Sequence, residues 1–60
     1  MNKQELLTFM ILEFENANKQ AMIGSGITEQ EADSKNEEYR LSISMLLAQV
    51  VDKMFEKNIL

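Results

Sequence analysis

The 60-residue sequence contains no cysteine, histidine, proline or tryptophan. Without cysteine there is no disulfide, and without cysteine and histidine there is no zinc site of the usual kind. The absence of histidine also removes the usual base of nucleophilic catalysis and the Glu-x-x-His pairs of di-iron helical bundles. The sequence therefore predicts a protein that is not an enzyme and that holds no metal and no cofactor.

Glycine is scarce, occurring only at positions 24 and 26, on either side of Ser25. This Gly-Ser-Gly segment has neither the lysine nor the preceding strand of a phosphate-binding loop, and it carries no acidic residue for calcium. Because glycine adopts positive φ without a steric penalty, we expect Gly24 to be the left-handed residue that ends a helix. The segment is predicted to be the turn between two helices.

Long apolar runs are absent too, since the longest covers only residues 9–12, far short of the roughly 20 that a membrane span needs. The N-terminal residues lack the basic, apolar and small-residue order of a secretory signal. We therefore expect a cytoplasmic protein without membrane contact. The net charge is −4 and the six basic residues are scattered, which disfavours binding to nucleic acid and favours a basic protein partner.

An apolar fraction of 45% is enough for a packed core, and its spacing predicts a helix over residues 3–23. Within this segment one apolar row has alternating steps of three and four residues, as at the seam of an antiparallel helix pair. This row consists of Leu7, Met10, Phe14, Ala17 and Ala21. Beside the row, Glu15 and Lys19 are expected to form an i,i+4 ion pair.

Thr28 followed by Glu31 is a capping box, which predicts a second helix from residue 29 to about residue 57. Residues 29–40 are polar, whereas residues 41–55 are the densest apolar segment. Their apolar stripe consists of Ile43, Leu47, Val50, Val51 and Met54, with Leu46 and Phe55 at its flanks. A turn at 24–28 is short enough to fold the helices into an antiparallel two-helix hairpin, a single all-α domain over residues 1–60.

One partner helix cannot cover all of these apolar side chains. The second helix is longer than the first, so we expect Met54, Phe55, Ile59 and Leu60 to lack cover within the chain. A chain of this size is also only marginally stable by itself. We therefore predict a homodimer in which two hairpins form a four-helix bundle, with Leu46, Met54 and Phe55 in the self-association surface.

Two further surfaces are candidates for binding a partner protein. Phe9 and Leu12 project opposite to the seam and are neighbours on one helix face. Contiguous exposed apolar residues mark interfaces, although single apolar residues on a surface are common. Glu29, Asp33 and Glu37 form an acidic ridge with i,i+4 spacing. Such a ridge either keeps a small protein soluble or binds basic residues, as a mimic of nucleic-acid charge would.

The layout of two long helices around a tight turn, with Lys3-Gln4-Glu5 and Phe14 in the first helix, is similar to the Rop family of plasmid copy-number regulators. The resemblance implies a hairpin that dimerises and binds paired RNA loops along the first helix. That family uses polar and basic side chains there, whereas Met10 is apolar in this chain.

Taken together, these features predict a small acidic interaction protein, a regulator or inhibitor of phage or plasmid type that docks on a larger protein. Two alternatives stay open. One is a Rop-like RNA-binding hairpin. The other is a structural subunit whose exposed apolar end docks permanently in a larger assembly.

Overall fold

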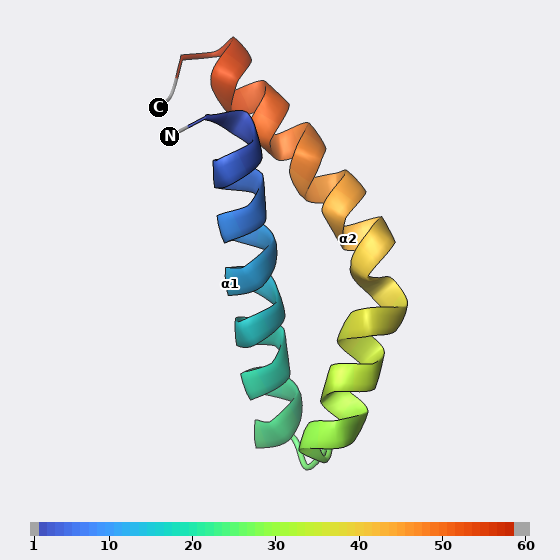
Figure 1. Ribbon diagram of the computed structural model, residues 1–60. Helices are drawn as coiled ribbons and strands as arrows, with labels where there is room; N and C mark the ends of the chain where they lie inside the picture. Colours follow the sequence, from blue (N-terminus) through green and yellow to red (C-terminus); the bar gives the residue numbers. More distant parts are fainter. Residues whose placement is uncertain (1, 59–60) are drawn as a thin grey trace.

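The computed structural model describes residues 2–58, which form two antiparallel α-helices joined by a short turn (Figure 1). Helix α1 spans Lys3–Gly24 and helix α2 spans Glu29–Glu56. The helices pack against each other, and the described part of the chain contains no strand. The predicted all-α hairpin is confirmed, and the helix ends lie within one residue of the expected positions. Ile59 and Leu60 lie outside the described residues.

Each helix begins at a polar residue that caps it. The Oδ1 atom of Asn2 accepts a hydrogen bond from the backbone N–H of Glu5 at 2.8 Å. In the same way, Oγ1 of Thr28 accepts a hydrogen bond from the backbone N–H of Glu31 at 3.2 Å. Each cap satisfies a donor in the first turn that has no partner within the helix. The predicted cap at Thr28 is confirmed, and Asn2 is a further one.

The turn between the helices is a Schellman motif. The N–H of Ile27 donates to the carbonyl of Met22 at 3.0 Å, and the N–H of Gly26 donates to the carbonyl of Ile23 at 3.1 Å. The glycine with positive φ is Gly26, at 101°, whereas Gly24 is the last residue of α1. The prediction that Gly24 is the left-handed residue is therefore wrong. The helical hydrogen bonds of α1 continue past Gly24 to the N–H of Ser25, so the left-handed residue is two positions further along the chain.

Alanine substitutions at the two glycines are expected to have opposite effects. Gly24→Ala should raise the free energy of unfolding by about 0.5–1 kcal/mol, because alanine favours the helix. Gly26→Ala should lower it by about 1–2 kcal/mol, because a side chain is strained at positive φ. A Cβ atom at either position meets nothing within 4 Å, so only the backbone differs. Urea denaturation of both variants tests this, and equal effects would contradict it.

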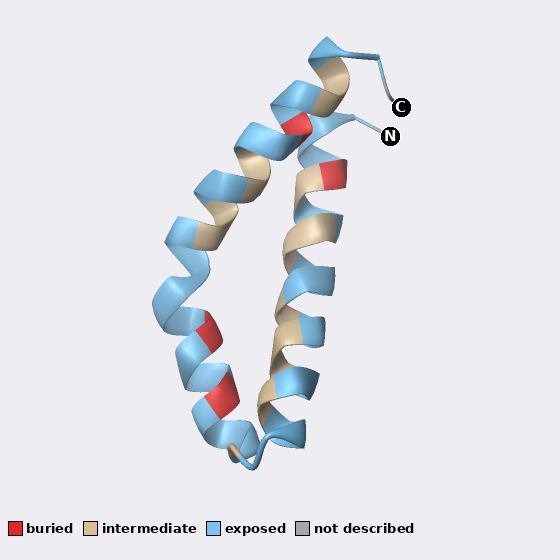
Figure 2. Cartoon of the chain, turned by 180° about the vertical axis from the view of Figure 1, so that it is seen from behind, coloured by how far each residue is buried: buried red, intermediate tan, exposed pale blue. Residues whose placement is uncertain are grey.

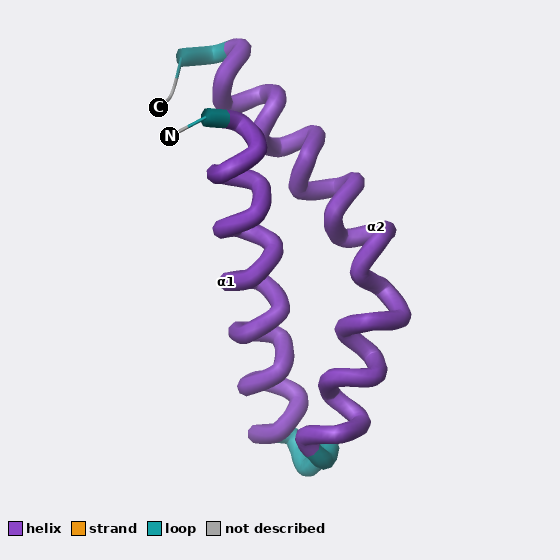
Figure 3. The backbone as a smooth tube through the Cα atoms, viewed as in Figure 1, coloured by secondary structure: helices purple, strands orange, loops and turns teal. Residues whose placement is uncertain are grey.

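The buried residues of the hairpin lie at its two ends rather than in its middle (Figure 2). Leu6 and Val51 are buried at the end where the termini lie, and Ala32 and Asn36 are buried near the turn. Between these ends α2 bows away from α1 (Figure 3). A partly open cavity of about 220 Å³ lies in the middle. Its apolar lining is Ile11, Phe14, Tyr39 and Ile43, and its polar lining is Glu15, Asn18, Asn36 and Arg40.

The face of α1 that meets α2 differs from the predicted seam. Leu7 and Met10 are half-buried as expected, whereas Phe14, Ala17 and Ala21 are exposed. In the second half of α1, the side chains that form hydrogen bonds and ion pairs with α2 are Glu15, Asn18 and Lys19. The seam prediction is therefore wrong for this half of the helix. The facing part of α2 is polar and binds charged and amide groups in preference to apolar ones.

The apolar half of α2 is covered only on the side that faces α1. Ile43, Leu47, Val51 and Met54 are buried or half-buried there. Phe55 is also half-buried, and the Nζ atom of Lys3 lies 5.8 Å from the centroid of its ring, within the range of a cation–π contact. The prediction that Met54 and Phe55 lack cover within the chain is therefore wrong. For Phe55, the start of α1 supplies part of that cover.

Candidate interaction surfaces

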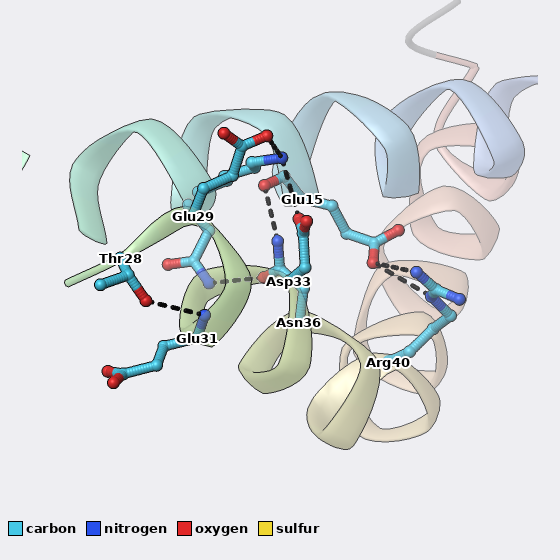
Figure 4. A network of polar contacts seen from close by, with 9 residues as sticks. Glu15, Thr28, Glu29, Glu31, Asp33, Asn36 and Arg40 are labelled. Atoms are coloured by element: carbon cyan, nitrogen blue, oxygen red, sulfur yellow. Dashed lines mark hydrogen bonds and ion pairs between the residues drawn. The ribbon is translucent and has the colours of Figure 1, made fainter. Parts of the chain in front are cut away.

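A buried amide joins the two helices near the turn (Figure 4). The Nδ2 atom of Asn36 donates to the main-chain carbonyl of Glu15 at 2.9 Å, and Oδ1 of Asn36 accepts from Nδ2 of Asn18 at 2.9 Å. Asn36 keeps only 9% of its surface exposed, and no buried side-chain polar atom among residues 2–58 lacks a partner. Each such bond contributes about 1 kcal/mol net. Asn36 therefore sets the register between α1 and α2.

Ion pairs flank this amide on both sides. Arg40 donates from Nε at 3.0 Å and from Nη2 at 2.8 Å to one carboxylate oxygen of Glu15. Lys19 binds Asp33 at 2.9 Å and Glu29 at 3.1 Å. The predicted pair between Glu15 and Lys19 is wrong, because each residue is paired across the hairpin instead.

These contacts also affect the pKa values of the two basic groups. Hydrogen bonds to Asp33 and then to Glu29 raise the pKa of Lys19. The hydrogen bond to Glu15 raises the pKa of Arg40. Both groups already have pKa values far above neutral in the unfolded chain, so both stay charged at physiological pH. One partner of each ion pair is exposed, since Glu29, Asp33 and Arg40 keep 57–73% of their side-chain surface in water. Solvent therefore screens the pairs, which orient the helices more than they stabilise them.

The acidic ridge is only partly available to a partner. Glu29 and Asp33 both hold Lys19, so two of its three members have a role inside the hairpin. Glu37 is exposed and lies within 4 Å of no cationic group among the described residues. Binding of a partner by this ridge stays a prediction, with Glu37 as the member that a partner can reach at least cost to the hairpin.

A larger apolar surface lies along one side of the hairpin. In α2, Tyr39, Leu46 and Val50 are 47–58% exposed, and Phe14 in α1 is 39% exposed. Phe14 and Tyr39 line the same central cavity, so the exposed apolar residues of α1 and those of α2 lie on the same side of the helix pair. We call this surface the apolar face. It consists of Phe14, Ala17, Ala21, Tyr39, Leu46 and Val50, all of which are exposed.

The sequence pattern predicts only part of the apolar face. Leu46 is predicted to take part in self-association, whereas Phe14, Ala17 and Ala21 are expected inside the hairpin. Their three-and-four spacing indicates that they share one apolar side of α1. Periodicity does not tell whether the contact is with the other helix of the same chain or with another molecule. Met54 and Phe55, also predicted to take part, are half-buried at the end of the hairpin.

The outer sides of both helices carry additional apolar pairs. Phe9 and Leu12 are 53% and 62% exposed and border a shallow groove with Glu5 and neighbouring polar residues. On α2, Leu41 and Met45 are 74% and 59% exposed. The second pair is not among the predicted sites, although its i,i+4 spacing is the same kind of signal as that of Phe9 and Leu12.

Residues 2–58 contain neither a metal-binding cluster nor a helix that could span a membrane. Within this part of the chain, no three acidic side chains come together as a metal site would require. Neither helix is both long and apolar enough to cross a membrane over the described residues. No protein-family model, curated protein or solved structure matches the chain. The apolar face, the Phe9 and Leu12 pair and the acidic ridge are the surfaces from which a function can be argued.

Proposed function

We propose that this chain is a non-enzymatic interaction protein that self-associates into a four-helix bundle and docks on a larger protein. The observation that supports the proposal best is the apolar face. Large side chains such as Leu46 and Tyr39 keep more than half of their surface in water there, at 58% and 56%. Apolar side chains gathered in this way on a small protein mark an interaction site.

The dimensions of the hairpin suit a second hairpin as the partner in self-association. The accessible surface is 4677 Å², whereas a compact monomer of 6.9 kDa exposes about 4,000 Å². One side of the hairpin, 40 Å by 18 Å, has a footprint of about 700 Å², close to the ~800 Å² that each partner buries in a standard interface. A second copy would therefore cover one whole side of the hairpin, including the apolar face.

The outer side of α1 supplies a surface for a larger protein. Phe9 and Leu12 lie away from α2 and stay exposed when the apolar face is covered. Their neighbour Glu5 and the exposed Glu37 on α2 are acidic, which favours a partner with basic side chains. Docking of this kind would make the protein a regulator or inhibitor that acts in the cytoplasm. Part of its binding would come from acidic side chains that mimic the charge of nucleic acid.

The charge distribution favours a protein partner over RNA. Three of the six basic residues, Lys3, Lys19 and Arg40, are engaged by carboxylates of the same chain. An RNA-binding surface needs several cations free to replace the counterions of the phosphates. Docking as a permanent subunit of a larger assembly uses the same apolar surfaces and remains the second candidate.

Affinity capture with single-residue variants tests the docking proposal. Phe9→Asp and Glu37→Lys should each lower recovery of the bound partner by at least about tenfold. The first puts a carboxylate into an apolar contact, and the second puts a positive charge opposite basic side chains. Gln20→Asp is the matched control for the first variant, since Gln20 is exposed on α1 and is not apolar. Glu38→Lys is the control for the second. Circular dichroism checks that all four fold. Unchanged capture by both test variants would rule out these surfaces.

A further inference from the structure

We infer that the apolar face is covered by a second copy of the chain lying antiparallel to the first, so that the turn of each copy lies beside the termini of the other. This inference rests on the proposed self-association and adds its geometry. Three properties of the described residues support it: the sizes of the side chains along the face, the distribution of charge along the hairpin, and the position of the central cavity.

Contacts within the hairpin show which residues lie at the same level. Asn18 is bonded to Asn36 near the turn, and Lys3 is bonded to Asp52 near the termini. At a rise of about 1.5 Å per residue, the middle of the 40 Å hairpin then lies close to Phe14 and Ile43. A two-fold axis that lies in the plane of the interface, perpendicular to the helices, would pass at the level of these two residues.

Rotation about this axis brings large and small side chains of the two copies into the same layers of the bundle. Leu46 of one copy comes to the level of Ala17 of the other, and Val50 comes to the level of Ala21. Close packing requires this alternation, since facing large residues clash and facing small residues leave voids. A parallel arrangement would instead place Leu46 beside its own equivalent and Ala17 beside its own equivalent.

The charge of the hairpin is also uneven along its length. Residues 13–40 contain seven acidic and three basic side chains, a net charge of −4, whereas the remaining described residues contain three of each. Packed helices lie about 8–10 Å apart, near the Debye length at physiological salt, so charges on facing copies interact. A parallel dimer would place the two acidic halves together. The antiparallel dimer separates them and brings Lys53 and Lys57 to the level of Glu29 and Glu31 of the second copy.

The central cavity lies on the proposed axis. Phe14, Tyr39 and Ile43 line it within one copy, and Phe14 and Ile43 are about level with the same residues of the antiparallel copy. Apolar side chains beside a void lose the dispersion contacts that a filled site would supply. Because a two-fold interface is self-complementary, each copy would fill the cavity of the other with the same aromatic residues.

Spin labels on single cysteines test the orientation by electron–electron double resonance. The chain has no native cysteine, so Ser25→Cys in the turn and Ser42→Cys at mid-height each carry one label. Both serines are exposed, and serine to cysteine is a small change. For the antiparallel dimer we expect about 40 Å between labels at position 25 and less than about 25 Å at position 42.

Each other outcome has a distinct meaning. Short distances at both positions would show a parallel dimer, which overturns the orientation but keeps the self-association. Distances of more than about 60 Å at position 25 and about 40 Å at position 42 would show hairpins joined only at their terminal ends, which also overturns the inference. No dipolar coupling at either position would show a monomer and overturn the proposed self-association itself. Circular dichroism of the labelled proteins confirms that they fold.

Discussion

Replacing Leu46 with glutamate is expected to convert a dimer of twice the 6.9 kDa chain mass into a monomer at micromolar concentration. Leu46 is 58% exposed in the isolated hairpin and lies in the middle of the apolar half of α2. A carboxylate at this position would be buried without a partner, at a cost of about 3 kcal/mol or more, so the dissociation constant should rise at least about 100-fold. Light scattering and sedimentation equilibrium measure both quantities.

Leu41→Glu is the matched control for this substitution. Leu41 is on the same helix and is 74% exposed, but it lies five residues from Leu46, about 140° around the helix axis. The same chemical change should therefore leave the dimer intact. If the Leu46 variant stays dimeric, or if the unmodified protein is a monomer at tens of micromolar, the apolar face is not a self-association surface.

Replacing Asn36 with alanine is expected to lower the free energy of unfolding by about 2 kcal/mol relative to the control variant Asn16→Ala. The substitution removes two hydrogen bonds between the helices and leaves the amide of Asn18 without its partner. A domain of this length has a total stability of only about 3–9 kcal/mol, so the loss is a large part of it. Near the turn, Ala32 is the only fully buried apolar residue among those described, so little else holds the helices together there.

Asn16 provides the comparison because it is exposed on α1 and makes no side-chain hydrogen bond to any described residue. Alanine is a better helix former than asparagine at either position, so this gain cancels between the two variants. Urea denaturation at one protein concentration, with the dimer fraction held equal, measures the difference. Equal stabilities would show that the Asn36 contacts do not stabilise the hairpin.

Local residue chemistry was enough to predict the helices and the turn between them. Thr28 caps α2 through a neighbour three residues away, and the apolar spacing of both segments has the helical period. These features depend on residues close together in the chain. The position of the left-handed glycine was harder to place, because Gly24 and Gly26 have the same intrinsic freedom. The choice between them depends on where the helical hydrogen bonds of α1 stop.

The contacts between the helices were decided only by the tertiary structure. The local rule pairs Glu15 with Lys19, but in the folded hairpin Arg40 and Asp33 replace these partners. Periodicity shows that Phe14 and its neighbours share one apolar side, yet it does not show what that side faces. The sequence by itself therefore determined two helices, a turn and an excess of apolar surface. The tertiary structure decided which apolar side chains are exposed, because the polar half of α2 binds the polar side of α1 and leaves the apolar face uncovered.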